Sequence, residues 1–482
     1  MNINTILRIL GILITLLSLT LIPPMIVSLI YTDSGGLALI ESFIITLLLG
    51  GSLWYRYRHE KRELKTRDGF LIVVLFWTVL SLFGSLPFIL ADDLNIRLVD
   101  AVFESFSGLT TTGATVLTGL DEMPKAILYY RQQLQWIGGM GIIVLAVAVL
   151  PMLGIGGMQL YKAEAPGPVK DSKLTPRIAG TAKALWYIYL SLTIACTLAY
   201  WLAGMTLFDA ICHAYSTVAI GGFSTHDASM AYFDSAAIEL ICSAFMLIAG
   251  VNFSLHYLAF KKVNLLHYFN DPEFKTYVSL LLAAIVICFM ILWSYETYSG
   301  VDSLRHAVFQ AISIGTTAGF TTVNYNLWPA FLPILLLFMS FVGGCAGSTG
   351  GGMKVIRFLL LFKQGFREVK KLIHPHAVFV IKLGKTPIDN KIVEAVWGFF
   401  AAYVAIFVVM LLVLMADGLD QVTAFSAVAA CLNNLGPGLG EVALNYSSIG
   451  DVSKWVLCLA MLLGRLEIFT LLVLIVPAFW RR

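Results

Sequence analysis

The chain has 482 residues, of which 59% are hydrophobic and only 13% are charged. Soluble domains are about half apolar and about one quarter charged, so this composition excludes an ordinary soluble protein and predicts a polytopic membrane protein. The formal net charge of +3 says little by itself, and no nucleic-acid partner is expected for the basic loops. The seven cysteines lie in apolar segments without CxxC or Cys/His ligand spacing, which supports neither a disulfide framework nor a zinc site.

Ten apolar stretches are long enough, or nearly long enough, to cross a bilayer, which takes about 20 residues. They cover residues 9–31, 36–55, 70–91, 132–160, 184–204, 235–260, 277–295, 328–342, 392–416 and 455–480. The first is interpreted as a retained span, because no small-residue cleavage site follows it. The eighth is unusually short. The sequence therefore predicts an all-α protein with an even number of spans.

Basic residues gather in alternate connections. Segment 56–67 has six, 162–183 has five, 261–275 has three and 354–391 has nine, whereas 205–233 and 416–451 contain no Lys or Arg. Short loops rich in Lys and Arg stay in the cytoplasm, so we expect both termini to be cytoplasmic.

The connections on the opposite side contain a fourfold repeat. Segments 100–116, 209–225, 306–322 and 423–439 align without a gap, with alanine at the second position of each. The fourteenth position is glycine in all four: Gly113, Gly222, Gly319 and Gly436. Each segment starts with 11 to 13 helix-compatible residues, which reach only about halfway across a bilayer. Irregular backbone is tolerated at that depth only where it lines a cavity or is buried in protein, so we expect a re-entrant helix followed by an extended loop.

Each repeat has one span before it and one after it, and all four run in the same direction. The predicted fold is four tandem units of span, pore helix, loop and span around a central pore, with two extra N-terminal transmembrane helices. The expected boundaries are 1–67 for the two-helix extension and 68–160, 161–262, 263–390 and 391–482 for the four pore repeats, the third with a broken second helix.

The loops have the composition of an ion-selectivity filter. Four short helices would direct the negative ends of their dipoles at a common axis, and four loops would offer carbonyl oxygens to a cation in place of its water. Glycine suits such a loop because it adopts positive φ readily. The predicted cation-binding residues are Thr111, Thr112, Gly113, Ile220, Gly221, Gly222, Thr317, Ala318, Gly319, Asn434, Leu435 and Gly436. A single such loop is more often only a loop, but four copies on one side favour the filter.

These motifs resemble the Trk/Ktr/HKT superfamily of potassium transporters over residues of about 70 to 482. The two additional N-terminal spans and the ending GRLEIFT (464–470) resemble its bacterial TrkH-type membrane subunits in particular. The resemblance implies potassium preference, because serine replaces the first filter glycine in sodium-transporting plant members and Gly113 stands here. Rubidium should also pass. Selectivity against sodium is expected to be modest, because AIGGF, TTAGF and NNLGPG share little beyond the glycine.

The second span of the third repeat contains the sequence GGCAGSTGGG, six glycines in ten residues. Its residues are Gly343, Gly344, Cys345, Ala346, Gly347, Ser348, Thr349, Gly350, Gly351 and Gly352. A lipid-facing helix would not tolerate them at about 1 kcal/mol each. We interpret this segment as a gate loop beneath the filter, where the family also has a flexible loop. The alternative is that the glycines permit close helix packing.

Arg465 stands in the apolar run CLAMLLGRLEIFTLLVLIV. A charge there is costly unless it faces a cavity or a partner. We expect Arg465 to face the pore beneath the filter, to donate to gate-loop carbonyls and to repel cations. The alternative is a structural ion pair with Glu467 or another acid.

Three polar residues, Glu104, His213 and Gln310, lie nine residues before their filter glycines. Ser426 lies ten residues before Gly436 and is grouped with them. We expect them to hold the pore helices behind the filter through buried hydrogen bonds. A role in proton coupling is the alternative for Glu104 and His213.

Two long polar connections, 165–177 and 363–385, lie on the side predicted to be cytoplasmic. They are either solvated loops or the docking site of a regulatory partner, which the resemblance implies to be a cytosolic ring of TrkA-type nucleotide-binding subunits. The chain itself has no GxGxxG before a helix and no Walker A motif. The resemblance also implies a homodimer, with one pore per chain.

The sequence thus predicts potassium uptake across the bacterial cytoplasmic (inner) membrane, with K⁺ as the transported ion and no cofactor on this chain. A sodium- or proton-coupled potassium symporter is the alternative. A membrane enzyme is disfavoured, because HExxH, GxSxG and paired intramembrane aspartates are absent and the eight histidines are dispersed.

Overall fold

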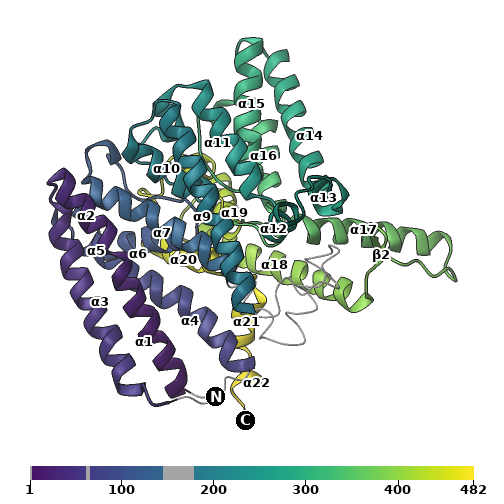
Figure 1. The fold of residues 1–482 in the computed structure, drawn as a ribbon. Helices are drawn as coiled ribbons and strands as arrows, with labels where there is room; N and C mark the ends of the chain where they lie inside the picture. Colours follow the sequence, from purple (N-terminus) through teal and green to yellow (C-terminus); the bar gives the residue numbers. More distant parts are fainter. Residues whose placement is uncertain (1–2, 61–65, 145–177, 482) are drawn as a thin grey trace.

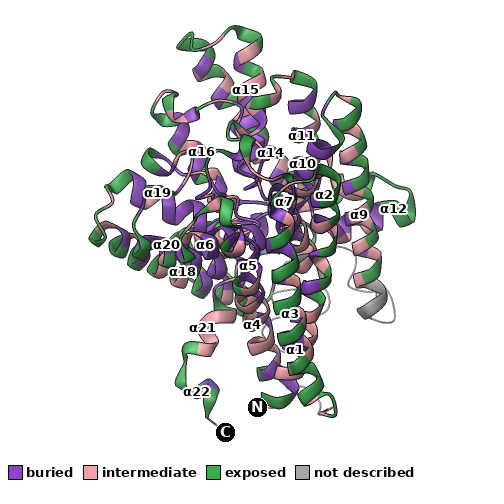
Figure 2. Ribbon diagram, turned by 90° about the vertical axis from the view of Figure 1, so that its left-hand side faces the viewer, coloured by how far each residue is buried: buried purple, intermediate pink, exposed green. Residues whose placement is uncertain are grey.

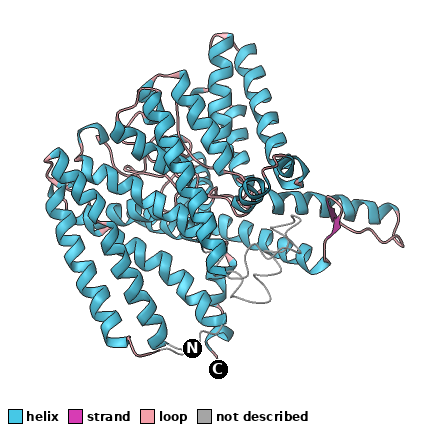
Figure 3. Ribbon diagram, viewed as in Figure 1, coloured by secondary structure: helices cyan, strands magenta, loops and turns pink. Residues whose placement is uncertain are grey.

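The structure, a computed structural model, describes residues 3–60, 66–144 and 178–481 and is built almost entirely of helices (Figures 1 and 3). The strands in this part of the chain form a small antiparallel hairpin of β1 (Lys382–Leu383) and β2 (Thr386–Pro387). Both termini lie at the same end of the molecule (Figure 1). That placement fits an even number of membrane crossings.

Six helical segments of the described residues are long and apolar enough to cross a membrane, and two bent pairs raise the number to eight. The six are Ile3–Tyr31 (α1, Ile3–Thr20, with α2, Ile22–Tyr31), Gly35–Tyr57 (α3), Arg67–Leu90 (α4, Thr66–Gly84, with α5, Leu86–Leu90), Ala182–Leu202 (within α9, Ile178–Leu202), Pro272–Ser294 (α14) and Asn390–Ala416 (α18). The chain is therefore a multi-pass membrane protein by length and composition.

Shorter helices follow four of these spans. They are α6 (Leu98–Leu109), α10 (Leu207–Ala219), α15 (Gly300–Gly315) and α19 (Gln421–Leu432). Three begin at a residue whose side chain accepts a backbone N–H: Thr206 before α10, Ser299 before α15 and Asp420 before α19. Every residue of α6 after Leu98 is buried or half-buried, as expected for a helix surrounded by protein.

After each short helix the chain returns through a loop into a second helix. These second helices are α7 (Lys125–Val144), α11 (Ala236–Ala249) with α12 (Phe253–Lys262), α16 (Phe331–Val342) with α17 (Val355–Ile373), and α20 (Asp451–Arg465) with α21 (Phe469–Ile475). Short helices α13 (Leu266–Asn270) and α22 (Pro477–Trp480), and 3₁₀ turns at 92–94, 120–122, 229–233, 325–327 and 440–442, complete the described chain. The same order of elements thus occurs four times.

The breaks in the second helices differ from the sequence prediction. The predicted span 235–260 bends by 93° between α11 and α12, and 455–480 bends by 115° between α20 and α21. Only the break after α16 carries a run of glycines, and it was the only one predicted. At the break of the fourth unit, Glu467 and Ile468 adopt positive φ (56° and 51°), and neither residue type predicts this conformation in a sequence. The predicted span 132–160 and the boundary 160/161 extend beyond the described residues.

The N-terminal helices α1 and α3 lie side by side at one flank (Figure 1). Their approach depends on two glycines: a Cβ on Gly11 would lie 2.5 Å from the backbone nitrogen of Trp54, and one on Gly50 would lie 2.7 Å from that of Thr15. Helix α2 packs against α7, and α1 packs against α4. This pair of spans precedes the first of the four units.

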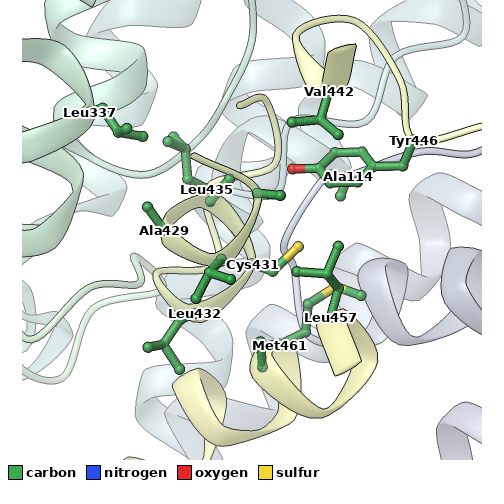
Figure 4. Packing of buried hydrophobic residues seen from close by; sticks show 14 of the residues in the cluster. Ala114, Leu337, Ala429, Cys431, Leu432, Leu435, Val442, Tyr446, Leu457 and Met461 are labelled. Atoms are coloured by element: carbon green, nitrogen blue, oxygen red, sulfur yellow. The ribbon is translucent and has the colours of Figure 1, made fainter. Parts of the chain in front are cut away.

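Buried residues gather around the short helices at the centre, and exposed residues cover the long helices outside (Figure 2). Around α19, Leu432 and Leu435 pack with Leu457 and Met461 of α20 and with Tyr446 (Figure 4). Large apolar side chains are exposed on the outer helices, for example Leu48, Leu202 and Val409. A soluble monomer rarely exposes so much apolar surface, and lipid would cover it in a membrane.

Candidate functional site

The four glycine-containing stretches 111–113, 220–222, 317–319 and 434–436 share one backbone conformation. In each, the first and third residues have positive φ and the middle residue does not. The φ angles are 51° and 85° for Thr111 and Gly113, 53° and 77° for Ile220 and Gly222, 71° and 83° for Thr317 and Gly319, and 53° and 97° for Asn434 and Gly436. Three of the first residues are β-branched, and positive φ costs such residues about 1–3 kcal/mol. Strain of this kind persists where surrounding contacts enforce it, and it clusters at functional sites.

The stretches 111–113, 220–222, 317–319 and 434–436 contact one another in a closed circle, which we call the ring. A Cβ placed on each glycine would meet the carbonyl oxygen of the middle residue of the next stretch: Gly113 meets Gly221 at 2.1 Å, Gly222 meets Ala318 at 2.0 Å, Gly319 meets Leu435 at 2.1 Å and Gly436 meets Thr112 at 2.7 Å. The first stretch therefore touches the second, the second the third, the third the fourth and the fourth the first. Any side chain at these four positions would collide with a neighbouring carbonyl.

The polar residues nine or ten positions before the ring glycines bind backbone or side-chain atoms of the segment that follows the ring. The carboxylate of Glu104 accepts from Val116 N and Thr115 Oγ1, both at 3.0 Å. His213 Nε2 lies 2.9 Å from Ser224 Oγ, and Gln310 Nε2 donates to Val323 O at 3.5 Å. Ser426 Oγ accepts from Leu439 N at 2.8 Å. All four side chains are buried, and each connects its short helix to the returning loop.

Arg131 of α7 is a buried charge that the sequence analysis missed. Its Nε donates to Glu104 Oε1 at 2.7 Å, its Nη1 to Ser224 O at 3.0 Å, and its Nη2 to Thr115 Oγ1 at 3.2 Å. It therefore ties the first stretch to the second. The signal was present, because an arginine inside a membrane segment needs a partner, and Glu104 is an acid at matching depth.

A cavity of about 160 Å³ lies against one face of the ring. All four ring glycines line it, together with Arg131, Ser224, His226, Asp227 and Tyr446. Tyr446 donates to Gly436 O at 2.7 Å and thereby supports the fourth stretch. The residues after the ring face this cavity, which makes it the mouth on the side where the loops return.

His226 lies in a cluster with Asp121 and Asp209 beside this mouth. Its Nδ1 contacts Asp121 of the first unit, and its Nε2 lies 3.4 Å from Asp209 Oδ1. Burial lowers the pKa of His226, but the contacts with Asp209 and Asp121 outweigh it and raise that pKa above its ordinary value. Asp227 accepts from Gly119 N and Leu120 N, at 3.1 and 2.9 Å. The cluster joins the return loops of units one and two.

The gate loop lies at the other face of the ring. A Cβ on Gly351 would lie 2.0 Å from Asn433 O, and one on Gly350 would lie 2.9 Å from Thr316 O. Gly351 N donates to Thr317 Oγ1 at 2.6 Å, and Gly352 N donates to Asn433 O at 2.9 Å. The loop therefore touches the third and fourth stretches directly. Apart from Gly347 and Gly352, its residues are buried.

Other contacts hold the gate loop to the second unit. Cys345 N donates to Gly250 O at 2.9 Å, Phe253 N donates to Gly347 O at 3.0 Å, and Thr349 Oγ1 donates to Val218 O at 3.0 Å. Gly250 and Phe253 flank the bend between α11 and α12. The break in the second unit thus provides the backbone groups that the loop of the third unit binds.

Arg465 reaches the gate loop. Its Nη1 donates to Thr349 O at 3.3 Å, whereas Nε and Nη2 have no hydrogen-bond partner in the described part of the chain. The guanidinium lines a second cavity of about 40 Å³ with Gly350, Gly351 and Asn434. This cavity shares no lining residue with the first. Glu467, the alternative partner expected for Arg465, pairs with Arg357 at 2.6 Å.

Of the two long polar connections predicted to be cytoplasmic, the structure describes only 363–385. Residues 165–177 lie outside the described residues. The segment 363–385 continues α17 and ends in the β1–β2 hairpin, which projects from the body of the molecule (Figure 1). Phe362, Phe366 and Leu372 of α17 are exposed.

Comparisons with known proteins agree with this architecture. A family model described as TrkH, cation transport protein, matches residues 36–482. The Trk system potassium uptake protein TrkH of Vibrio parahaemolyticus is 61% identical over 484 residues, and that of Escherichia coli K12 is 57% identical over 482 residues, with 100% of each chain covered in both alignments. The crystal structure of the potassium transporter TrkH from Vibrio parahaemolyticus matches with a TM-score of 0.93 at 58% identity, covering 100% of both chains.

Proposed function

Since this chain belongs to the TrkH family of cation transport proteins, we propose that its ring is the path by which potassium is taken up. Potassium uptake is the function that the comparisons support, and it makes the chain a transporter rather than an enzyme. K⁺ is the transported ion. The single observation that carries the assignment to the ring is its closure, in which each glycine packs on the carbonyl of the next stretch.

The ring would act through its backbone. A cation entering from the 160 Å³ mouth loses water and gains carbonyl oxygens of 111–113, 220–222, 317–319 and 434–436 in exchange. The short helices α6, α10, α15 and α19 end at the ring, so the negative ends of their dipoles favour a cation there. The glycines keep side chains out of the path.

The gate loop 343–352 would close the other face of the ring. It lines the 40 Å³ cavity together with Asn434 of the ring, and it is held by hydrogen bonds to units two, three and four. Arg465 would stabilise this closed position through Thr349 O and repel cations while its remaining donors face the cavity. For ions to pass, the loop must move.

We further propose the setting in which this happens. The protein would reside in the bacterial inner membrane with both termini in the cytoplasm, as the distribution of basic residues favours. It would form a homodimer with one ring per chain. A ring of TrkA-type nucleotide-binding subunits would dock on the cytoplasmic side, where α17 and the hairpin project, and would control the gate loop.

Rubidium uptake into potassium-loaded proteoliposomes tests the assignment. We compare the intact chain with Gly113→Ser, with and without external sodium. The serine Cβ would lie 2.1 Å from Gly221 O in a backbone at φ 85°, so we expect weaker uptake and a lost preference over sodium. An unchanged preference would contradict the role of the ring.

The same assay separates permeation from coupled symport. Uptake driven by the rubidium gradient alone, without any sodium or proton gradient, is expected for the ring. Uptake that needs one of those gradients would favour the symporter.

A further inference from the structure

The four first residues of the ring stretches have different side-chain environments. Thr111 Oγ1 has no hydrogen-bond partner in the described part of the chain, and Ile220 has no polar atom. Asn434 Nδ2 donates to Thr112 Oγ1 and to Met461 O, both at 3.0 Å. Thr317 alone among the four accepts from the gate loop, through Gly351 N at 2.6 Å. Among the described residues, the hydrogen bond between the loop and a side chain of the ring is therefore confined to the third quarter.

Loss of this hydrogen bond would leave the buried N–H of Gly351 without its acceptor. Thr317 and Gly351 are both buried, and a buried N–H without an acceptor costs about 1–3 kcal/mol. The loop also bonds to the chain beside the ring through Gly352 N to Asn433 O and through Thr349 Oγ1 to Val218 O, and both of these acceptors are backbone carbonyls. Among the described residues, the Thr317 hydroxyl is thus the side chain of the ring that hydrogen-bonds the loop.

Thr317 also carries backbone strain. It is β-branched and held at φ 71°, which is sparsely populated for such residues. Strained conformations persist when neighbouring contacts fix them, and the bond from Gly351 is one such contact. Release of the loop would therefore free the residue that leads directly into Ala318 and Gly319 of the ring.

We propose that Thr317 is a positioning residue that couples the gate loop to the ring, so that the loop and the third stretch change conformation together. This inference rests on the proposed function and adds a residue to it. Coupling is reciprocal, so ions that occupy the ring must also alter how readily the loop opens. A threonine that served only to fill space would not transmit that effect.

The first test is rubidium uptake by the full chain, reconstituted alone, in a cycle of four proteins. They are the parent, Thr317→Val, a variant lacking residues 346–349, and the combination of both changes. Valine keeps the shape and the branching of threonine but cannot accept from Gly351 N. We expect Thr317→Val to raise uptake roughly tenfold in the intact chain, the factor that 1.4 kcal/mol produces, and to raise it no further in the shortened chain.

Thr317→Ser is the matched control, because it restores the hydroxyl. The loop keeps its acceptor in this variant, so its uptake should rise clearly less than that of Thr317→Val. An equal effect of valine in both backgrounds, or no effect in the intact chain, or a rise with serine as large as the rise with valine, would overturn the coupling. Absence of rubidium uptake in all four proteins would instead overturn the proposed function of the ring.

The second test uses Cys345, a buried thiol of the gate loop itself. Its rate of reaction with a water-soluble maleimide, followed by mass spectrometry of its peptide, reports how often the loop opens. In the parent we expect this rate to differ at least twofold between potassium and choline solutions. In Thr317→Val the rate should be higher and should not respond to potassium. A potassium effect of the same size in both proteins would overturn the proposal.

Discussion

The buried pair of Glu104 and Arg131 lies beside the ring and joins two of its quarters. Their side chains are 0% and 1% exposed. Two charges removed from water gain little net stability, but a single charge left behind is very costly. The pair is therefore a requirement of the packing between units one and two.

Removal of Arg131 alone should destabilise the protein strongly. For Arg131→Met we expect a loss of about 3–5 kcal/mol, because the Glu104 carboxylate stays buried without its partner. The double variant Glu104→Gln with Arg131→Met should recover part of that loss. The thermal unfolding midpoint in detergent measures both. An Arg131→Met midpoint equal to that of the parent would show that Glu104 is satisfied without it.

His226 makes the mouth sensitive to pH. Its pKa is raised in the folded protein, so the stability from its contacts with Asp121 and Asp209 is fully present below the ordinary histidine value. That stability is lost as the pH rises through the raised pKa. We expect the midpoint of thermal unfolding to fall between pH 6 and a pH above that value, and to fall less in His226→Gln. A parallel fall in both proteins would place the effect elsewhere.

Among the elements, the interrupted second helices distinguish this fold from a simple bundle. Within the described residues, three of the four are broken. The break of the third unit is the gate loop; Gly250 at the break of unit two accepts from Cys345 N, and Arg465 just before the bend of unit four donates to Thr349 O. An unwound segment at membrane depth needs partners for its backbone groups. Here the breaks of units two and three supply hydrogen-bond partners for each other's backbone groups.

Arg465 allows a test at this level. Arg465→Ala removes the donor to Thr349 O, so the closed loop should be less stable and rubidium uptake without a partner protein should rise several-fold. Arg357→Ala is the control, because Arg357 is also buried but pairs with Glu467. The control should lower thermal stability more than it raises uptake. Equal uptake by the two variants would argue against a specific role of Arg465.

The recurrence of alanine and glycine at fixed positions in the four segments predicted the helix and loop order that occurs four times in the structure. The unit boundaries and the role of the ring glycines in cation binding stay predictions. The sequence was also sufficient for the contact of Arg465 with the gate loop, since an intramembrane charge needs a partner. It was insufficient for the bends at 250–252 and 466–468. Ordinary residues form these bends, and tertiary contacts rather than local preference hold them. The cluster of His226, Asp121 and Asp209 was missed because Asp121 belongs to another unit and is 105 residues from His226 in the sequence.

For the molecule as a whole, all seven cysteines are buried free thiols. The native protein should therefore react slowly with a membrane-impermeant maleimide, which makes single added cysteines readable. Leu444 in a return loop and Lys385 in the hairpin are both exposed. We expect Leu444→Cys to be labelled from outside intact cells and Lys385→Cys only after the cells are opened. The reverse pattern would invert the proposed orientation.

Four unlike quarters are fused into one polypeptide, and this has a genetic consequence. In a channel assembled from identical subunits, one codon change alters every quarter at once. Here a single mutation alters one quarter and leaves three as they were, so ion preference can be adjusted in small steps. Only the third quarter bears the Thr317 contact and only the fourth has the asparagine pair. Natural selection can thus modify opening and discrimination at separate loci of one gene.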